Sequence, residues 1–284
     1  MAGVCGWIAA YGDGNVPELA KKMAGRLARH DGSEVHTLGG ARSAVAAAAP
    51  QGQADVCEHR GWRCALQGHY YWSDSEYSAL TEKEGAARTL VNGFERHGTH
   101  VLDRLGGSFS VVLVNENRQL AFMATDRIGV SPVNYVGTTD CLVFASDPAA
   151  LFAYPHLSRR IDCQSVFNYL YFHVVPSPNG VYESQRRVLP GGFVRWDSGE
   201  LTEGTYWRAR YQESASQRPF QELKEEFWSA LESSVERFVN GSKLGCFLSG
   251  GTDSSTVAGV LDRVQGEPAA TYSIGFDAEG YDEM

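Results

Sequence analysis

Three features that mark common protein classes are missing from this 284-residue sequence. No apolar run approaches the about 18 residues that a membrane-spanning helix needs, and the first residues lack the charged and apolar regions of a signal peptide. The six cysteines lie far apart and form no CxxC pair, which argues against a disulfide framework and against a zinc site. We therefore expect a cytoplasmic protein without a membrane partner.

An excess of positive charge is missing as well. Lys and Arg number 25 against 34 Asp and Glu, which gives a net charge of −9. Residues 219–284 hold 4 basic and 12 acidic residues, so most of the negative charge lies there. A surface that follows the phosphate backbone of nucleic acid is therefore not expected. The hydrophobic content of 43% is typical of a globular protein, and the length suggests about two domains.

The first two-thirds of the chain is predicted to be rich in strands. Apolar runs and turn residues predict strands at 4–9, 62–66, 108–114, 119–124, 134–136 and 141–145, the last four forming two hairpins. Gln67-Gly68 is interpreted as a turn, and the alanine-rich segment 41–49 fits either a strand or a helix. Four-residue spacing predicts helices at 17–28, at 85–97 and after the candidate N-cap Asp162, with a Pro- and Gly-rich hairpin at 181–196.

The pattern changes after the polar segment 212–218, the best candidate for a domain boundary. A helical apolar stripe runs from Phe220 to Phe238. It is followed by a strand at 244–248, a loop at 249–255, a helix at 254–264 and a strand at 270–276. A strand, a helix and a second strand in this order predict a parallel βαβ unit.

The loop from Ser249 to Ser255 carries the clearest chemical signal. Its paired glycines allow backbone N–H groups to converge, and the helix that follows adds unsatisfied donors and a partial positive charge. We predict an anion site here. It is not a Walker loop, since the loop contains no lysine, and the GxGxxG pattern is missing as well. Asp253 would repel a bare polyphosphate, so a divalent cation is expected between them. The alternative is a serine-rich N-cap with Asp253 placed favourably against the helix dipole.

This loop and several other segments resemble one enzyme family. Residues 247–255, FLSGGTDSS, resemble the pyrophosphate loop of ATP-pyrophosphatases and in particular of the asparagine synthetase family. The block DRIGVSPVNY at 126–135, followed by FASD at 144–147, resembles the end of the amidotransferase domain in that family. LGGSF at 105–109 and VLPGG at 188–192 match further segments in the same order.

The resemblance implies a fold in two parts. Residues 1–210 would form a class II glutamine amidotransferase-like domain, an α+β Ntn-type αββα sandwich. Residues 219–284 would be the N-terminal part of an α/β ATP-pyrophosphatase domain with a parallel sheet and a PP-loop. The helical remainder of that second domain is absent, so the chain is interpreted as a portion of a longer enzyme or as a truncated product.

The resemblance also implies a function, that of an asparagine synthetase-like ligase. A carboxylate such as aspartate would be adenylated by ATP with Mg²⁺, pyrophosphate would leave, and an amide would form with nitrogen from glutamine or ammonia. The implied cofactors are ATP and Mg²⁺, the partners are these small molecules, and a homodimer is left open. The implied nucleotide-site residues are Leu248, Ser249, Gly250, Gly251, Thr252, Asp253, Ser254, Ser255 and Ile274, with Leu248 and Ile274 near adenine and Asp253 on Mg²⁺.

The amidotransferase half departs from the family pattern. In the family an N-terminal cysteine is the nucleophile, and its free α-amine is the general base. The matching Cys5 has a free amine only if the four residues before it are removed, and otherwise it is expected to be a buried strand residue. Arg42 is the candidate anchor of the glutamine carboxylate. Gln67 and Gly68 replace the family's Asn-Gly oxyanion hole, and Ala86 replaces an aspartate that holds the glutamine amine.

These departures leave two alternatives to a complete synthetase. The first is a related ligase whose glutaminase half is an inactive scaffold, as in β-lactam synthetases and lasso-peptide cyclases. The second is a truncated, non-catalytic remnant.

Overall fold

The computed structural model describes residues 2–11, 15–29, 32–211, 218–239 and 244–275. The chain falls into two compact units, Met1–Arg210 and Tyr211–Met284. The predicted boundary segment 212–218 lies outside the described residues except for Arg218.

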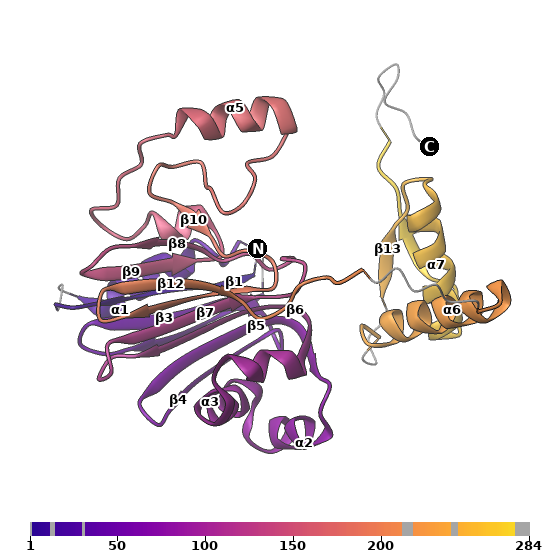
Figure 1. The fold of residues 1–284 in the computed structure, drawn as a ribbon, viewed down its shortest axis with the longest axis horizontal. Coiled ribbons are helices and arrows are strands. Elements are labelled where there is room, and N and C mark those ends of the chain that lie inside the picture. Colours follow the sequence, from indigo (N-terminus) through magenta and orange to yellow (C-terminus); the bar gives the residue numbers. More distant parts are fainter. Residues whose placement is uncertain (1, 12–14, 30–31, 212–217, 240–243, 276–284) are drawn as a thin grey trace. The chain divides into compact units, whose positions relative to one another are not determined.

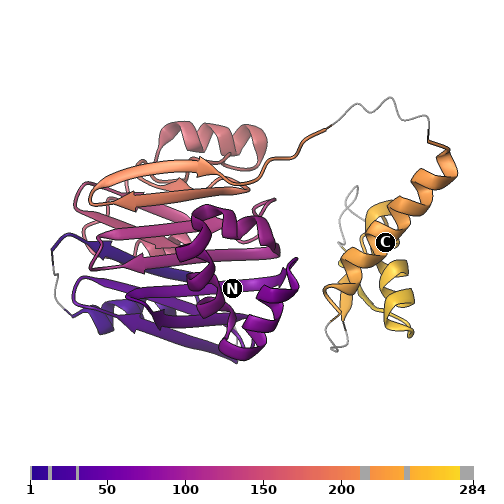
Figure 2. The same cartoon turned by 60° about the horizontal axis from the view of Figure 1, so that its bottom comes forward.

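The first unit consists of two stacked six-stranded sheets with helices on their outer faces (Figures 1 and 2). The strand pairs described in this unit are all antiparallel. In spatial order, the first sheet contains β10 (Arg186–Arg187), β8 (Asn134–Gly137), β9 (Cys141–Ala145), β1 (Gly3–Ala9), β3 (Ser43–Pro50) and β2 (Ser33–Gly39). The second contains β12 (Glu200–Thr205), β11 (Gly192–Asp197), β7 (Leu120–Thr125), β6 (Leu105–Asn115), β5 (Trp62–Trp72) and β4 (Ala54–His59). The predicted αββα sandwich is confirmed.

Alternating side chains of each strand divide the apolar residues among three cores. Val4 and Ile8 of β1 pack between the sheets together with residues of the second sheet. Cys5 and Trp7 of the same strand face the outer helices. The outer layers are α1 (Val16–Gly25) and α4 (Pro148–Leu151) on the first sheet, and α2 (Ser75–Glu84) and α3 (Ala86–His97) on the second.

Helix starts follow capping chemistry. Asp162 caps α5 (Cys163–Phe172) by accepting N–H bonds from Gln164 and Ser165, which confirms its predicted role. The start of α3 has no cap of its own, but the N–H of Ala87 donates to the Asp55 carboxylate of β4 at 2.9 Å. A short helical segment, η1 (Gly98–Arg104), connects α3 to β6.

Most predicted elements of the first unit are present. The strand at 4–9, both predicted hairpins and the helix at 85–97 are confirmed, and the alanine-rich segment is strand β3. The turn at Gln67-Gly68 is wrong because β5 continues through it to Trp72. The hairpin at 181–196 is also wrong, since β10 pairs with β8 in one sheet and β11 pairs with β7 in the other.

In the described part of the second unit, the chain forms two helices and a two-stranded sheet. Its elements are α6 (Phe220–Glu236), β13 (Gly245–Phe247), α7 (Thr252–Gln265) and β14 (Ala270–Tyr272). The two strands pair in parallel, which confirms the predicted βαβ unit. Among the large apolar side chains described in this unit, only Val260 and Leu261 are fully buried. The end of the predicted strand, Phe276, lies outside the described residues.

A search of the described residues finds no helix whose length and apolar character would allow it to cross a membrane.

Candidate functional site

The segment between β13 and α7 forms a sharp turn from strand to helix. Beyond the last residue of β13, the N–H of Leu248 donates to the carbonyl of Tyr272 at 2.9 Å, which extends the pairing with β14. Gly250 then adopts a φ of +80°, a conformation that side-chain-bearing residues rarely take. This glycine turns the backbone into α7, which begins at Thr252, two residues earlier than predicted.

Two serines hold this turn together. The N–H of Ser249 donates to Oγ of Ser254 at 3.2 Å, and the two hydroxyl oxygens lie 3.1 Å apart. The Ser254 hydroxyl also donates to the carbonyl of Gly251 at 3.1 Å. The hydroxyl of Ser254 is therefore engaged in ordering the loop.

The N-terminus of α7 is left without a side-chain cap. Its N-cap is Gly251, which has no side chain to accept from the first-turn N–H groups. These groups have no acceptor within the helix, and they carry a partial positive charge. The serine cap of the alternative interpretation is therefore not formed, whereas Asp253 does lie in the first turn, as that interpretation also expected. Asp253 is exposed in this first turn and makes no ion pair among the described residues.

A cleft of about 540 Å³ lies beside the turn. Its lining includes four predicted residues, Leu248, Ser249, Gly250 and Ile274. Phe247, Tyr272 and Ser273 also line it, and sequence reasoning missed them. Their position in the sequence could have predicted this, because they lie at the carboxyl ends of two parallel strands, and such ends lie at the same edge of a sheet. The hydroxyl of Ser273 donates to the carbonyl of Leu248 at 2.7 Å and so ties the two sides of the cleft together.

The remaining predicted nucleotide-site residues, Gly251, Thr252, Asp253, Ser254 and Ser255, form the first turn of α7 next to the cleft. Asp253 is the predicted Mg²⁺ ligand. Magnesium in nucleotide sites is usually held by one or two carboxylates together with phosphate oxygens and water, so a single exposed carboxylate fits that group. In the described part of the chain no cluster of three metal-binding side chains is found.

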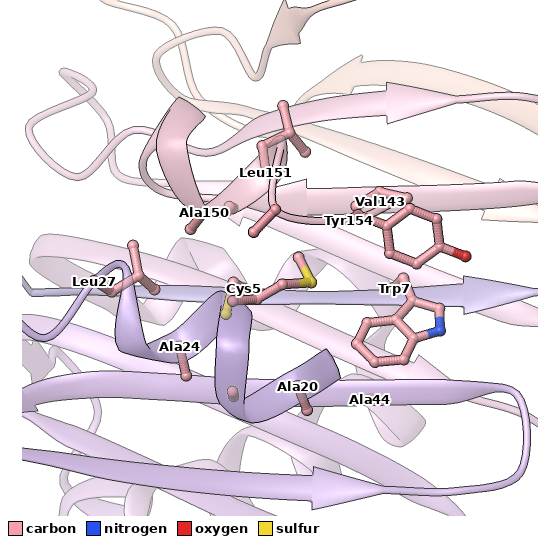
Figure 3. Close-up of a cluster of buried hydrophobic side chains, with 14 of the residues drawn as sticks. Cys5, Trp7, Ala20, Ala24, Leu27, Ala44, Val143, Ala150, Leu151 and Tyr154 are labelled. Atoms are coloured by element: carbon pink, nitrogen blue, oxygen red, sulfur yellow. The ribbon is translucent and has the colours of Figure 1, made fainter. Parts of the chain in front are cut away.

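Cys5 occupies a different environment. It lies in the middle of β1 between Ala46 of β3 and Ala145 of β9, and its side chain is fully buried. Figure 3 shows its sulfur among apolar side chains such as Leu27 of the segment after α1 and Leu151 of α4. Burial raises the pKa of the Cys5 thiol to about 12.

Two of the residues before Cys5, Gly3 and Val4, are part of the same strand. Gly3 and Val4 pair with Ala48 and Ala47 of β3. The N–H of Val4 also donates to Oγ of Ser146 at 2.9 Å, and the N–H of Ser146 donates back to the carbonyl of Val4 at 2.8 Å. Removal of Met1–Val4, which a free amine on Cys5 would require, would therefore delete paired strand residues.

Gln67 and Gly68 also have structural partners. Gln67 is buried in β5 and accepts from the Ser110 hydroxyl at 3.3 Å. The N–H of Gly68 donates to the carbonyl of Gln53 at 2.9 Å, so this predicted oxyanion donor is already occupied. Cys5 faces the outer helices, whereas Gln67 shares the inter-sheet side of β5 with Ala65. The sheet backbone thus separates Cys5 from Gln67.

Arg42 lies at the other end of β1. It precedes β3 at Ser43, which pairs with Ile8, and its guanidinium donates to the carbonyl of Ala10 at 2.7 Å. Cys5 pairs with Ala46, which lies four residues, or about 13 Å, beyond Arg42 along the extended chain. The structure therefore does not bring Cys5, Arg42 and Gln67 together in one site.

The backbone of Arg42 belongs to a cluster around Glu116. The Glu116 carboxylate accepts from the N–H groups of Ala41 and Arg42, from the Ser43 hydroxyl at 2.7 Å and from the Arg63 guanidinium at 3.3 Å. Ser43 belongs to the first sheet and Arg63 to the second. Glu116 therefore joins the two sheets of the sandwich.

Comparison with known proteins places most of the chain in one family. The family model described as glutamine amidotransferase domain matches residues 1–207. The chain belongs to this family. A second model, described as asparagine synthase, matches residues 226–284 of the same amidotransferase-family chain. The two matches stand in the order that the sequence predicted, and the resemblance to the asparagine synthetase family is confirmed.

Two curated relatives of this chain are named asparagine synthetase. Asparagine synthetase [glutamine-hydrolyzing] 1 of Bacillus subtilis (strain 168) is 27% identical over 197 residues, which cover 69% of this chain and 30% of the relative. The putative asparagine synthetase [glutamine-hydrolyzing] of Mycobacterium tuberculosis (strain H37Rv) is 26% identical over 217 residues, which cover 74% of this chain and 33% of the relative. The chain thus matches about a third of the length of these relatives.

Among solved structures, glutamine phosphoribosylpyrophosphate amidotransferase from B. subtilis, complexed with ADP and GMP, shows a TM-score of 0.46 and 14% identity. The alignment covers 95% of this chain and 65% of that protein.

Proposed function

We propose that this chain is part of an asparagine synthetase-like ligase that activates a carboxylate with ATP and Mg²⁺. In this proposal, residues 1–210 are the amidotransferase-like domain and 219–284 the N-terminal part of the ATP-pyrophosphatase domain. The observation that carries the proposal is the uncapped N-terminus of α7, reached through Gly250 at positive φ and adjoining an open cleft. The names of the relatives support the same reaction class.

In this proposal, cleavage falls between the α- and β-phosphates, as the resemblance of residues 247–255 to a pyrophosphate loop implies. A carboxylate oxygen of the substrate would attack the α-phosphorus, and the bond to the bridging oxygen of pyrophosphate would break. The first-turn N–H groups of α7 would stabilise the negative charge that develops on pyrophosphate. Asp253 would hold Mg²⁺ against the phosphates, and backbone groups near Leu248 and Ile274 would hold the adenine. Nitrogen supplied by glutamine or ammonia would then attack the carbonyl carbon of the acyl-adenylate, which forms the amide and releases AMP.

ATP binding to the full chain tests the proposal by calorimetry with and without Mg²⁺. We expect Mg²⁺-dependent binding that Asp253→Asn weakens about tenfold, which corresponds to a loss of about 1.4 kcal/mol of binding free energy. Asp262→Asn, near the other end of the same helix, is the matched control and should leave the affinity unchanged. The proposal fails if the wild-type chain does not bind ATP with Mg²⁺, or if both variants weaken binding equally.

A second candidate concerns the amidotransferase-like unit, which would serve as a scaffold without glutaminase activity. The burial of Cys5 in mid-strand favours this version. Glutamate release from glutamine by the full chain is the test, with Cys5→Ala as the comparison. We expect no glutamate above the level of the variant. Glutamate release that disappears in Cys5→Ala would contradict the scaffold hypothesis and leave ATP binding by the other unit unaffected.

A further inference from the structure

A second cavity, of about 370 Å³, lies in the first unit between α1 and α4. Lys22 and Arg26 line it from α1 and its C-terminal end, and Arg159 lines it from the segment after α4. Phe152 and Tyr182 form an aromatic wall, with their ring centroids 4.3 Å apart. The cavity is of the size of small-ligand sites, and three of its lining side chains are cationic.

The three cations converge for structural reasons. Lys22 and Arg26 are four residues apart, so their side chains emerge on the same face of the helix. The guanidinium of Arg159 donates to the carbonyl of Phe152 at 2.7 Å, which holds it at the cavity. The cluster therefore rests on backbone geometry and a specific hydrogen bond.

The neighbouring carboxylates are engaged elsewhere. Asp147 pairs with Arg29 at 3.0 Å, and Glu183 pairs with Arg160 at 3.0 Å. Glu18 accepts from the Asn15 side chain at 2.8 Å. Within the described part of the chain, no carboxylate forms an ion pair with any of the three cations that line the cavity.

The three cations give the cavity a positive charge that an anion would neutralise. Lys22, Arg26 and Arg159 are exposed, so water screens part of the repulsion among them. The C-terminal dipole of α1 offsets part of the repulsion at Lys22 and Arg26. An anion in the cavity would compensate all three charges, in a chain whose overall charge is −9.

We propose that this cavity binds a small anion that carries one or two phosphate groups. Two guanidinium groups offer paired N–H donors that match phosphate oxygens, and the lysine adds a point charge. The aromatic wall would contact the part of the ligand that bears the phosphate. The ligand is either inorganic, such as pyrophosphate, or a phosphate monoester of a small organic molecule.

Lysine acetylation of the folded full chain, followed by mass spectrometry, tests the site directly. Lys21 and Lys22 are both exposed neighbours on α1, but only Lys22 lines the cavity. We expect pyrophosphate to slow the acetylation of Lys22 by about tenfold, which corresponds to about 90% occupancy of the site. Lys21 should react at an unchanged rate. Because the readout belongs to one residue, it is independent of phosphate binding at the α7 loop.

Two further arms complete the test. Glycerol phosphate in place of pyrophosphate distinguishes an organic monoester from an inorganic ligand, since the preferred source will protect Lys22 at the lower concentration. Arg26→Ala, an exposed change at the end of α1, should abolish the protection, and Arg96→Ala, an exposed change on α3 outside the cavity, should retain it. The proposal is overturned if neither phosphate compound protects Lys22, or if Lys21 and Lys22 are protected equally.

Discussion

Cys5 of β1 stands directly opposite Ala46 of β3, with its sulfur buried in the core that faces the outer helices. A cysteine nucleophile acts as an accessible thiolate. Burial raises the pKa of the Cys5 thiol to about 12, so at neutral pH this residue is a protonated core side chain. Its position therefore predicts low reactivity in the folded chain.

Alkylation of the native protein checks this expectation. Cys163 is exposed on α5, whereas Cys5 and Cys64 are fully buried, and burial also raises the pKa of Cys64. With iodoacetamide at mildly alkaline pH, we expect Cys163 to be labelled first. Cys5 and Cys64 should react only after denaturant is added. Labelling of Cys5 at the rate of Cys163 in the folded protein would show that the thiol is accessible.

Glu116→Gln should destabilise the first unit at neutral pH by about 1.5–3 kcal/mol, the range for hydrogen bonds to a charged group. Burial alone would raise the pKa of Glu116, but hydrogen bonds from Ser43, Arg42 and Ala41 outweigh it and hold the pKa below its ordinary value. A lowered pKa contributes stability that is present at neutral pH and is lost as the pH falls through it. The difference between wild type and variant should therefore shrink below about pH 4.

Urea unfolding at neutral and acidic pH measures this difference. Glu200→Gln is the matched control, since Glu200 is exposed and forms no ion pair in the described part of the chain. A destabilisation by Glu116→Gln that stays constant down to acidic pH would contradict the role of its ionised form.

Tyr70→Phe should change the alkaline stability of the same unit. Burial, assisted by Asp55 and Cys64, raises the pKa of Tyr70 to about 12. Above its ordinary pKa of about 10, the unfolded chain loses this proton more readily than the folded chain, so stability falls as the pH rises towards 12. Phenylalanine has no proton to lose, so the Tyr70→Phe variant should not show this fall in stability.

The expected result is that Tyr70→Phe gains stability relative to wild type between neutral pH and about pH 11. Urea unfolding at the two pH values measures the gain. Tyr11→Phe, at an exposed tyrosine, should show none. Parallel pH profiles for wild type and Tyr70→Phe would contradict the prediction.

Gly250→Ala and Gly259→Ala should have opposite effects on α7. Gly250 has a φ of +80°, where a side chain costs about 1–2 kcal/mol. Gly259 lies within the helix with open space around an added Cβ, so alanine there should stabilise by about 1 kcal/mol. Amide hydrogen exchange over α7 should become faster in Gly250→Ala and slower in Gly259→Ala. Effects of the same sign would show that φ at Gly250 is not the controlling factor.

Local chemistry was enough to predict much of the fold. Asp162 was readable as an N-cap, and the hairpin turn at 115–118 was readable because it separates two apolar runs. The βαβ order at 244–272 followed from the change of periodicity. These features depend on residues that are neighbours in the sequence, so a single sequence was enough to predict them.

The errors came from tertiary contacts. Gly68 suggested a turn, but a Cβ there would collide with the carbonyl of Ser108 on β6, so glycine serves the close approach of two strands. Helix α2 was missed because only Tyr77 of its residues is buried, which leaves little periodicity. Strand β2 was missed because it is a largely exposed edge strand. For the candidate nucleotide site, the loop was readable, whereas Ser273 joined it through pairing of β13 with β14.

The cluster around Glu116 has a consequence for motion within the sandwich. Sliding of one sheet over the other would require a single carboxylate to release donors from both layers at once. Slippage and loss of these bonds are therefore the same event. The amide protons of Ala41 and Arg42, although they precede a strand, should exchange with solvent on the timescale of the whole double layer and not on that of a surface loop.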